Sequence, residues 1–346
     1  MASEDRMTSE STASGGVLVA SSLSKTFSTG RTGGRRARVS AVDDISITLG
    51  RGESVGLVGE SGCGKTTLAR MLVGLEQPDS GTVTLDGQEL SGLRGHQRRA
   101  ARRRIQMIFQ DPYLSLNPRL TIAELIAEPL IVHKLAATKA ERTDKVAALL
   151  QRVGLSPDMM HRYPHNFSGG QRQRIGIARA LAAEPEVIIC DEPVSALDLS
   201  VRAQILNLLR GLQQQAGITL LFISHDLSVV RHVCDRTAVM YLGRIVEQGP
   251  VEQVHDRPAH PYTQALLSAV PIVDPAARGA LSRRILLPGD PPSPSSPPSG
   301  CRFRTRCRLA SDTCSAQRPP LRPFDGEDVT ESVVACHHAD LAAAAK

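Results

Sequence analysis

A glycine-rich loop carries the clearest chemistry in this sequence. The apolar run at 53–58 predicts a strand, and it leads into Gly59-Glu-Ser-Gly-Cys-Gly-Lys-Thr66, which fits the pattern GxxxxGK followed by Ser or Thr. In such a loop, backbone N–H groups at a helix start surround phosphate oxygens. Lys65 would reach the β- and γ-phosphates, and the Thr66 hydroxyl would bind Mg²⁺. The predicted nucleoside triphosphate contacts are Gly59, Glu60, Ser61, Gly62, Cys63, Gly64, Lys65, Thr66 and Thr67.

Two adjacent acids follow a second predicted strand. Residues 187–190 form an apolar run, typical of a strand buried on both faces of a parallel sheet, and Asp191 and Glu192 come directly after it. In phosphoryl transfer the first acid suits Mg²⁺, and the second can polarise an attacking water. We therefore expect these acids to act on the nucleoside triphosphate that the glycine-rich loop binds.

A second anion-binding turn lies between the loop and the acids. It opens a predicted basic helix with a Ser-Gly-Gly-Gln sequence, and its N–H groups would form another nest for an anion. One nucleotide cannot use both nests of one chain, so we expect two subunits that face each other head to tail. The predicted residues of this turn are Ser168, Gly169, Gly170 and Gln171.

The elements around these motifs alternate between strand and helix. Residues 119–165 have a largely helical pattern, and the apolar run at 218–223 predicts another buried strand. Such alternation predicts a parallel α/β sheet with phosphate chemistry at the carboxyl ends of its strands. The basic stretch at 94–104 is predicted to be a solvated helix face. Six prolines at 288–298 indicate a stiff linker to a cysteine-containing tail.

Composition restricts the partners. The net charge of the 346-residue chain is +6 and only 3% of its residues are aromatic, which argues against a nucleic-acid partner. No apolar run approaches the ~18 residues of a membrane-spanning helix. The segment 1–16 is rich in Ser, Thr and Gly and has no apolar core, so we expect it to be disordered rather than a secretory signal. We therefore expect a cytosolic protein.

Taken together, the motifs resemble those of the ATP-binding subunit of an ATP-binding-cassette (ABC) transporter. The resemblance spans about residues 17–255 and has the motifs in the family's order. The matching positions are Gly59–Thr66 for Walker A, Gln110 for the Q-loop, Ser168–Gln171 for the signature, Asp191 and Glu192 for Walker B with its catalytic glutamate, Asp198 for the D-loop, and His225 for the H-loop.

The resemblance implies a role for each position. Glu192 would act as general base or water orienter, His225 would hold the γ-phosphate and the water in line, and Gln110 would sense Mg²⁺ beside Thr66 and Asp191. Phe27 stands where the family's adenine-stacking aromatic is expected. The implied ligand is ATP with Mg²⁺, completed by the partner's signature turn and by Asp198.

A closer resemblance is to the ATPases of oligopeptide/dipeptide permeases. It lies in residues 107–119, 163–170 and 260–263 and in the cysteine tail, and the Ser-Leu-Asn-Pro-Arg stretch favours the F-type subunit. This resemblance implies a D-type ATPase partner, two transmembrane permease subunits, an extracytoplasmic solute-binding protein, and a peripheral position on the cytoplasmic face of the membrane. Nickel or another solute is an alternative cargo, and a soluble non-transport ABC ATPase is the alternative class.

The resemblance also implies a fold and its division. The expected fold is an α/β P-loop NTPase, with a RecA-like parallel core, an N-terminal antiparallel β-subdomain, a helical subdomain and a small Cys/Pro-rich C-terminal extension. The expected boundaries are a disordered 1–16, an ATPase domain at 17–255 with its helical subdomain at 119–170, and an extension at 256–346.

Four cysteines in the tail suggest a metal. Four thiols can ligate Zn²⁺ or an iron–sulfur cluster, and their spacings are wider than those of short CxxC knuckles. The interleaved arginines would offset the charge of a four-thiolate cluster, and the family resemblance favours a structural 4Fe–4S cluster. Zinc, or no metal at all, are the alternatives. The candidate ligands are Cys301, Cys307, Cys314 and Cys336.

Overall fold

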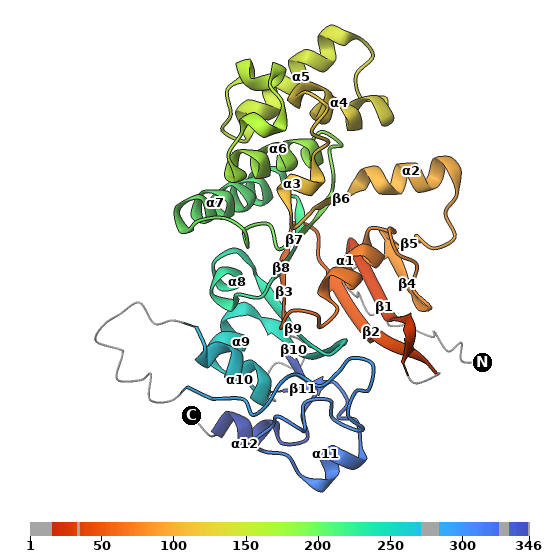
Figure 1. Ribbon diagram of the computed structural model, residues 1–346, viewed down its shortest axis with the longest axis vertical. Coiled ribbons are helices and arrows are strands. Elements are labelled where there is room, and N and C mark those ends of the chain that lie inside the picture. The colour runs from red at the N-terminus through yellow and green to blue at the C-terminus, as the bar shows by residue number, and fades with distance from the viewer. Residues whose placement is uncertain (1–15, 33–34, 271–283, 325–331, 345–346) are drawn as a thin grey trace, which may run out of the picture.

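The computed structural model describes residues 16–32, 35–270, 284–324 and 332–344. The expectation of disorder at 1–16 therefore falls almost wholly outside the described residues. Figure 1 shows a central sheet, a group of helices at one end of the molecule, a smaller sheet at its side, and the C-terminal elements at the opposite end. The expected mixed α/β architecture is confirmed.

The strands are β1 (Leu18–Thr32), β2 (Arg35–Leu49), β3 (Ser54–Val58), β4 (Ser80–Leu85), β5 (Gln88–Glu89), β6 (Ile105–Ile108), β7 (Val187–Asp191), β8 (Thr219–Ser224), β9 (Arg236–Tyr241), β10 (Arg244–Pro250), β11 (Arg322–Pro323) and β12 (Val333–Val334). The helices are α1 (Lys65–Leu72), α2 (Gly95–Arg104), α3 (Pro112–Ser115), α4 (Ile122–Val132), α5 (Lys139–Arg152), α6 (Gly169–Leu181), α7 (Leu199–Ala216), α8 (Leu227–Val233), α9 (Val251–Asp256), α10 (Pro261–Ser268), α11 (Asp312–Ala316) and α12 (Ala339–Ala344), with 3₁₀ turns η1 (Pro157–His161) and η2 (Pro164–Asn166).

The larger sheet has eight strands in the order β11-β12-β10-β9-β3-β8-β7-β6. Neighbours from β9 to β6 are parallel, and β10, β12 and β11 continue the sheet in antiparallel fashion. Every residue of β3, β7 and β8 is buried, which accounts for their continuous apolar runs. Because these strands are parallel neighbours, their carboxyl ends meet at one edge, and that edge carries the predicted chemistry.

The smaller sheet is antiparallel, in the order β2-β1-β4-β5. Leu18 pairs with Leu49 on one side and with Leu85 on the other, and all three side chains are buried. They belong to a core that also includes α1 and one face of the larger sheet. This sheet is thereby fixed beside the loop that precedes α1.

The group of helices comprises α4, α5, α6 and the two 3₁₀ turns, which confirms the largely helical pattern at 119–165. Thr121 starts α4 with a capping box, since its side chain accepts from the Glu124 N–H while the Glu124 carboxylate accepts from the Thr121 N–H. Val146 and Leu150 of α5 are buried in the same core as α6.

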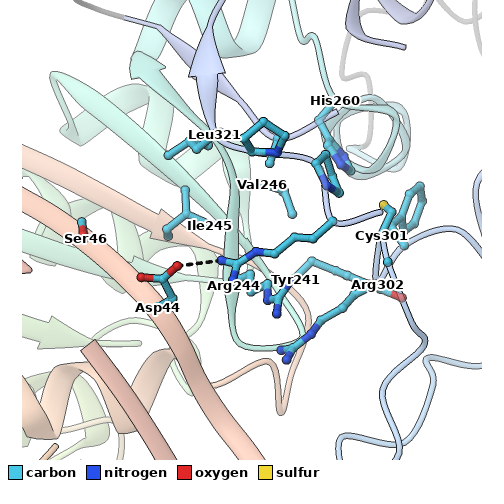
Figure 2. A pocket seen from close by; sticks show the side chains of 16 residues that line it. Asp44, Ser46, Tyr241, Arg244, Ile245, Val246, His260, Cys301, Arg302 and Leu321 are labelled. Carbon is cyan, nitrogen blue, oxygen red and sulfur yellow. Dashed lines mark hydrogen bonds and ion pairs between the residues drawn. The ribbon is translucent and has the colours of Figure 1, made fainter. Parts of the chain in front are cut away.

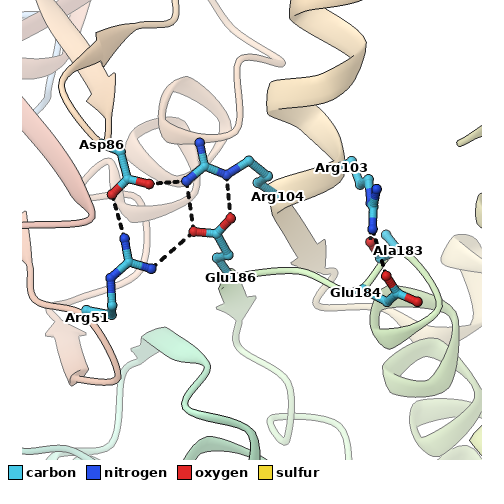
Figure 3. A network of polar contacts seen from close by, with 7 residues as sticks. All are labelled: Arg51, Asp86, Arg103, Arg104, Ala183, Glu184 and Glu186. Carbon is cyan, nitrogen blue, oxygen red and sulfur yellow. Dashed lines mark hydrogen bonds and ion pairs between the residues drawn. The ribbon is translucent and has the colours of Figure 1, made fainter.

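A ring of charges joins the small sheet to the large one. Arg104 at the end of α2 pairs with Asp86 and with Glu186, where its Nη2 lies 2.8 Å from a carboxylate oxygen, and Arg51 contacts the same two acids (Figure 3). The remainder of α2 is largely exposed, as predicted for its basic stretch, with Ala101 as its one buried residue. The ring fixes α2 at the junction of the two sheets.

The C-terminal elements continue the main sheet. Glu247 and Gln248 of β10 pair with β12, and the predicted boundary at 255/256 falls inside α9. Buried Glu247 accepts from the N–H groups of Ala259 and His260, at 2.7 and 3.0 Å, which fixes the start of α10. Burial raises the pKa of Glu247 to about 7. No helix within the described parts of the chain is long and apolar enough to cross a membrane.

Candidate functional site

A cavity of about 630 Å³ lies at the carboxyl ends of β3, β7 and β8. Four segments far apart in sequence meet there, namely the glycine-rich loop, the region after β6, the turn after β7 and the turn after β8. Its lining residues are Val39, Ala41, Gly59, Glu60, Ser61, Gly62, Gly64, Lys65, Thr66, Thr67, Gln110, Glu192, His225 and Leu266. Eleven of these fourteen are residues that the sequence predicted for nucleotide binding or catalysis.

The loop curls around the Lys65 ammonium group. Its Nζ donates to the carbonyl oxygens of Gly59 and Glu60 at 2.8 and 3.0 Å, and the side chain is 5% exposed. Gly64 has φ +109°, and a Cβ there would lie 2.0 Å from the Ala41 carbonyl oxygen, so only glycine fits. The loop thus presents a buried cation and its backbone to the cavity, as a phosphate requires.

Thr66 and Asp191 supply adjacent oxygens. The Thr66 hydroxyl lies 3.2 Å from Asp191 Oδ1, and Asp191 is 3% exposed at the end of β7. Burial raises the pKa of Asp191, and this hydrogen bond opposes the rise. A buried carboxylate beside a hydroxyl is the oxygen donor set that Mg²⁺ prefers, and a cation there would supply the missing counter-charge. These residues therefore fit a magnesium ion.

Glu192 is at the centre of a second polar group. Its Oε2 lies 3.2 Å from Gln110 Nε2 and 3.3 Å from His225 Nδ1, so the side chains that follow β6, β7 and β8 converge on one carboxylate oxygen. Glu192 adopts φ +46°, an uncommon conformation outside glycine. Its N–H donates to the Ile223 carbonyl oxygen at 3.1 Å, which holds the turn in this conformation. The carboxylate is positioned to accept a hydrogen bond from a water in the cavity.

Some predicted residues lie outside the cavity lining. Ser168 caps α6 in a capping box with Gln171, so the signature turn of residues 168–171 is well ordered yet absent from that lining. Asp198 is exposed and caps α7 by accepting from the Val201 N–H at 2.9 Å.

Phe27 is 37% exposed and pairs across strands with Val39, which does line the cavity. Cys63 and Asp191 are buried and are not among the lining residues.

Known proteins resemble the chain over most of its length. A family model described as ABC transporter matches residues 42–195, and one described as oligopeptide/dipeptide transporter, C-terminal region, matches 246–314. A probable peptide ABC transporter ATP-binding protein of Sinorhizobium fredii is 55% identical over 308 residues, covering 89% of this chain and 85% of that protein. The chain belongs to the ABC transporter family of ATP-binding proteins. The oligopeptide transport ATP-binding protein OppF of Escherichia coli is 54% identical over 281 residues, covering 81% of this chain and 84% of that protein.

Solved structures agree with this assignment. A dimeric ATP-binding cassette in a post-hydrolysis state, bound to ADP and Pi, is similar with a TM-score of 0.61 and 28% identity, covering 68% of this chain and 98% of that one. The cbiO1 protein from Clostridium perfringens gives 0.58 and 28%, covering 69% of this chain and 90% of that one. The chain is therefore an ABC ATPase with the P-loop NTPase fold, and its substrate is ATP.

Three residues of the ABC ATPase cavity were not predicted from sequence. Val39 and Ala41 come from β2, and Leu266 comes from α10, more than 200 residues further along the chain. No motif marks them, because each is an apolar residue that reaches the cavity only through tertiary packing. These three residues form the apolar part of the cavity lining, whereas Lys65 and Glu192 belong to its charged part.

The four tail cysteines lie close enough to affect one another. Burial raises the pKa of Cys336 to about 12, and the thiols of Cys307, Cys301 and Cys314 add to the rise. Backbone N–H groups donate to two of the sulfurs, Leu309 to Cys307 Sγ at 3.4 Å and His338 to Cys336 Sγ at 3.3 Å. Across the described ranges, however, no three His, Cys, Asp or Glu side chains form a group that could hold a metal ion.

A second hollow, of about 430 Å³, separates the small sheet from the cysteine-containing tail. Asp44 and Ser46 lie on one side of it, and Cys301, Arg302 and His260 lie on the other (Figure 2). The charges are largely matched there, because Arg318 pairs with Asp44 at 3.1 Å and Arg302 pairs with Asp43. The tail is therefore held against β2 by ion pairs.

Proposed function

We propose that this ABC ATPase hydrolyses ATP to power the import of oligopeptides or dipeptides through partner membrane subunits. The observation that carries the proposal is a C-terminal match to the oligopeptide/dipeptide transporter region on the same chain as a cavity containing Lys65, Glu192 and His225. The names of the relatives, which include a peptide transporter protein and an oligopeptide transport protein, support this cargo. An importer ATPase for another solute, such as nickel, is the alternative that a transport assay would separate.

The proposed roles follow from the geometry. Lys65 and the loop N–H groups bind the β- and γ-phosphates, and Thr66 and Asp191 hold the Mg²⁺ that balances phosphate charge. Glu192 orients or deprotonates the attacking water, as its position in the cavity allows. His225 and Gln110 contact the same carboxylate oxygen and fix its direction. Phe27, which is 37% exposed within β1, is proposed to stack on adenine.

The signature turn is proposed to act on a neighbouring ATPase subunit. Residues 168–171 form the N-terminus of α6 and lie outside the cavity of their own chain. The capping box uses the N–H groups of Ser168 and Gln171, and those of Gly169 and Gly170 lie between them at the helix N-terminus, where an anion is favoured. Closing that turn on the phosphate of a facing subunit would complete the partner's site, with Asp198 near the contact. The corresponding turn of the partner would complete the site of this chain. We propose a D-type ATPase as this partner, since the closer resemblance is to the F-type member of such a pair.

The remaining partners follow from the importer assignment. Two transmembrane permease subunits would carry the cargo, an extracytoplasmic solute-binding protein would deliver it, and this chain would sit peripherally on the cytoplasmic face. The proposed division is an ATPase domain at 17–255, with a helical subdomain at 119–170 that contacts the permease together with residues 111–118, and a C-terminal extension at 256–346.

A structural 4Fe–4S cluster on Cys301, Cys307, Cys314 and Cys336 is proposed for the tail. Support comes from four mutually interacting thiols and from N–H donors to two sulfurs, as cluster sites require. Binding would require deprotonated thiols.

Replacing the carboxylate of Glu192 tests the hydrolytic role. Glu192→Gln in the complex with the permease and the partner ATPase should lower the turnover rate ~10²–10⁴-fold, because a positioned base is lost while the phosphate contacts survive. ATP affinity should stay unchanged. Glu184→Gln, an exposed glutamate paired with Arg103, is the matched control. Normal turnover by Glu192→Gln would contradict the role, and failure of the wild-type complex to import peptides would contradict the cargo.

The shared site predicts an effect in trans. Ser168→Arg should abolish hydrolysis at the partner subunit while this chain binds ATP normally, because bulk and charge enter the nest that faces the partner. The measurement is the rate of ATP hydrolysis by the complex, made once with the partner's own catalytic glutamate intact and once with it mutated. The difference between the two rates gives the hydrolysis at the partner's site. Ser296→Arg, in the exposed Pro-rich stretch, controls for added charge. Loss confined to this chain's own ATP binding would refute the arrangement.

Metal content tests the cysteine group. Anaerobic purification should give a brown protein that absorbs near ~400 nm and carries about four irons per chain. Cys307→Ser should remove the colour and leave ATP binding intact, whereas Cys234→Ala, a buried cysteine outside the group, should keep both. Colourless, iron-free protein from anaerobic cells would end the cluster proposal.

A further inference from the structure

We propose that the C-terminal turn at residues 301–307 positions the nucleotide loop, with Arg306 and Tyr262 as positioning residues that act on Glu60. This inference rests on the proposed binding of ATP by the loop. It concerns contacts between segments about 200 residues apart or more, which neither the loop motif nor the family's motifs describe. Two routes lead from the turn to the loop.

The direct route is an ion pair. Arg306 Nη1 lies 3.1 and 3.0 Å from the two carboxylate oxygens of Glu60, and the arginine side chain is only 9% exposed. Glu60 lines the cavity, and its carbonyl oxygen accepts from Lys65 Nζ at 3.0 Å. The tail therefore holds the residue whose backbone contacts the phosphate-binding lysine. A largely buried pair such as this one is costly to break from one side, because the remaining charge loses its partner.

Tyr262 strengthens the same contact from α10. Its fully buried hydroxyl accepts from the Glu60 N–H at 2.9 Å, so both the backbone and the carboxylate of Glu60 are held. The Tyr262 ring packs against Phe303 and Tyr241, with centroids 5.4 and 4.6 Å away. Phe303 belongs to the same turn as Arg306, so the aromatic group anchors the turn that carries the arginine.

The indirect route passes through the turn between β9 and β10. Arg302 donates to the Leu242 carbonyl oxygen and pairs with Asp43. The next residue, Gly243, donates its N–H to the Cys63 carbonyl oxygen at 2.8 Å. Arg306 thus supports the beginning of the loop at Glu60, and Arg302, four residues earlier, supports its middle at Cys63. Phosphate binding depends on the placement of the loop N–H groups. The contacts that hold the loop at Glu60 and at Cys63 should therefore set the affinity for nucleotide.

ATP affinity of the full-length chain tests the proposal. Arg306→Ala should weaken binding of ATP·Mg²⁺, measured by calorimetry, about fivefold or more, the low end of typical coupling between sites. Arg306→Lys should restore part of the affinity, since it keeps the charge. Arg304→Ala is the matched control, because Arg304 lies in the same turn and its guanidinium donates to Ser299 rather than to the nucleotide loop. It should bind ATP as the wild type does.

A double-mutant cycle separates positioning from folding. Glu60→Gln should weaken binding to a similar extent, and the Glu60→Gln/Arg306→Ala pair should lose no more than either single change. Additive losses, or equal affinities for Arg306→Ala and Arg304→Ala, would overturn the proposal. If Arg306→Ala fails to fold, Glu60→Gln still tests the same ion pair, because it alters the partner that lies in the loop. Wild-type affinity of Glu60→Gln for ATP·Mg²⁺ would refute the inference. A wild-type chain that does not bind ATP would instead refute the proposed function.

Discussion

The parallel pairing of β3, β8 and β7 is the constraint on which the rest of this structure depends. It places the glycine-rich loop next to Asp191, although Thr66 and Asp191 are 125 residues apart, and leaves their oxygens 3.2 Å from each other. The same pairing brings Glu192 and His225 to one edge. A change of register by one residue would reverse which side chains face each layer, and the fully buried strands make such a shift costly.

The charges at this edge are held near to one another before any ligand binds. Lys65 is buried against carbonyl oxygens, and Asp191 is buried beside one hydroxyl, so neither charge is fully compensated within the chain. Buried charges are stable only when paired. A magnesium-bound triphosphate would place its phosphate anions beside Lys65 and its cation beside Asp191. Each buried charge would then have a partner of opposite sign. ATP binding thus completes the electrostatics that the fold leaves open.

Much of this site could be predicted from the sequence because its signals are local. The loop motif, the apolar run before Asp191 and the cap residue Ser168 each specify their backbone within a few residues, and the structure has a strand or helix at every one of these places. The contact of Arg306 with Glu60 could not be predicted in this way. It joins residues 246 positions apart and depends on the packing of Phe303 against Tyr241 and Tyr262, which no local sequence pattern indicates. Apolar wall residues such as Leu266 likewise have no pattern of their own.

We infer that Thr66 and Asp191 couple nucleotide binding to Mg²⁺. The most direct measurement is the affinity of the full-length chain for ATP with Mg²⁺ and with a chelator, for the wild type and for Asp191→Asn. Mg²⁺ should tighten ATP binding to the wild type and should have little effect on Asp191→Asn, because the amide lacks the charge that holds the cation. The same gain from Mg²⁺ in both proteins would contradict it.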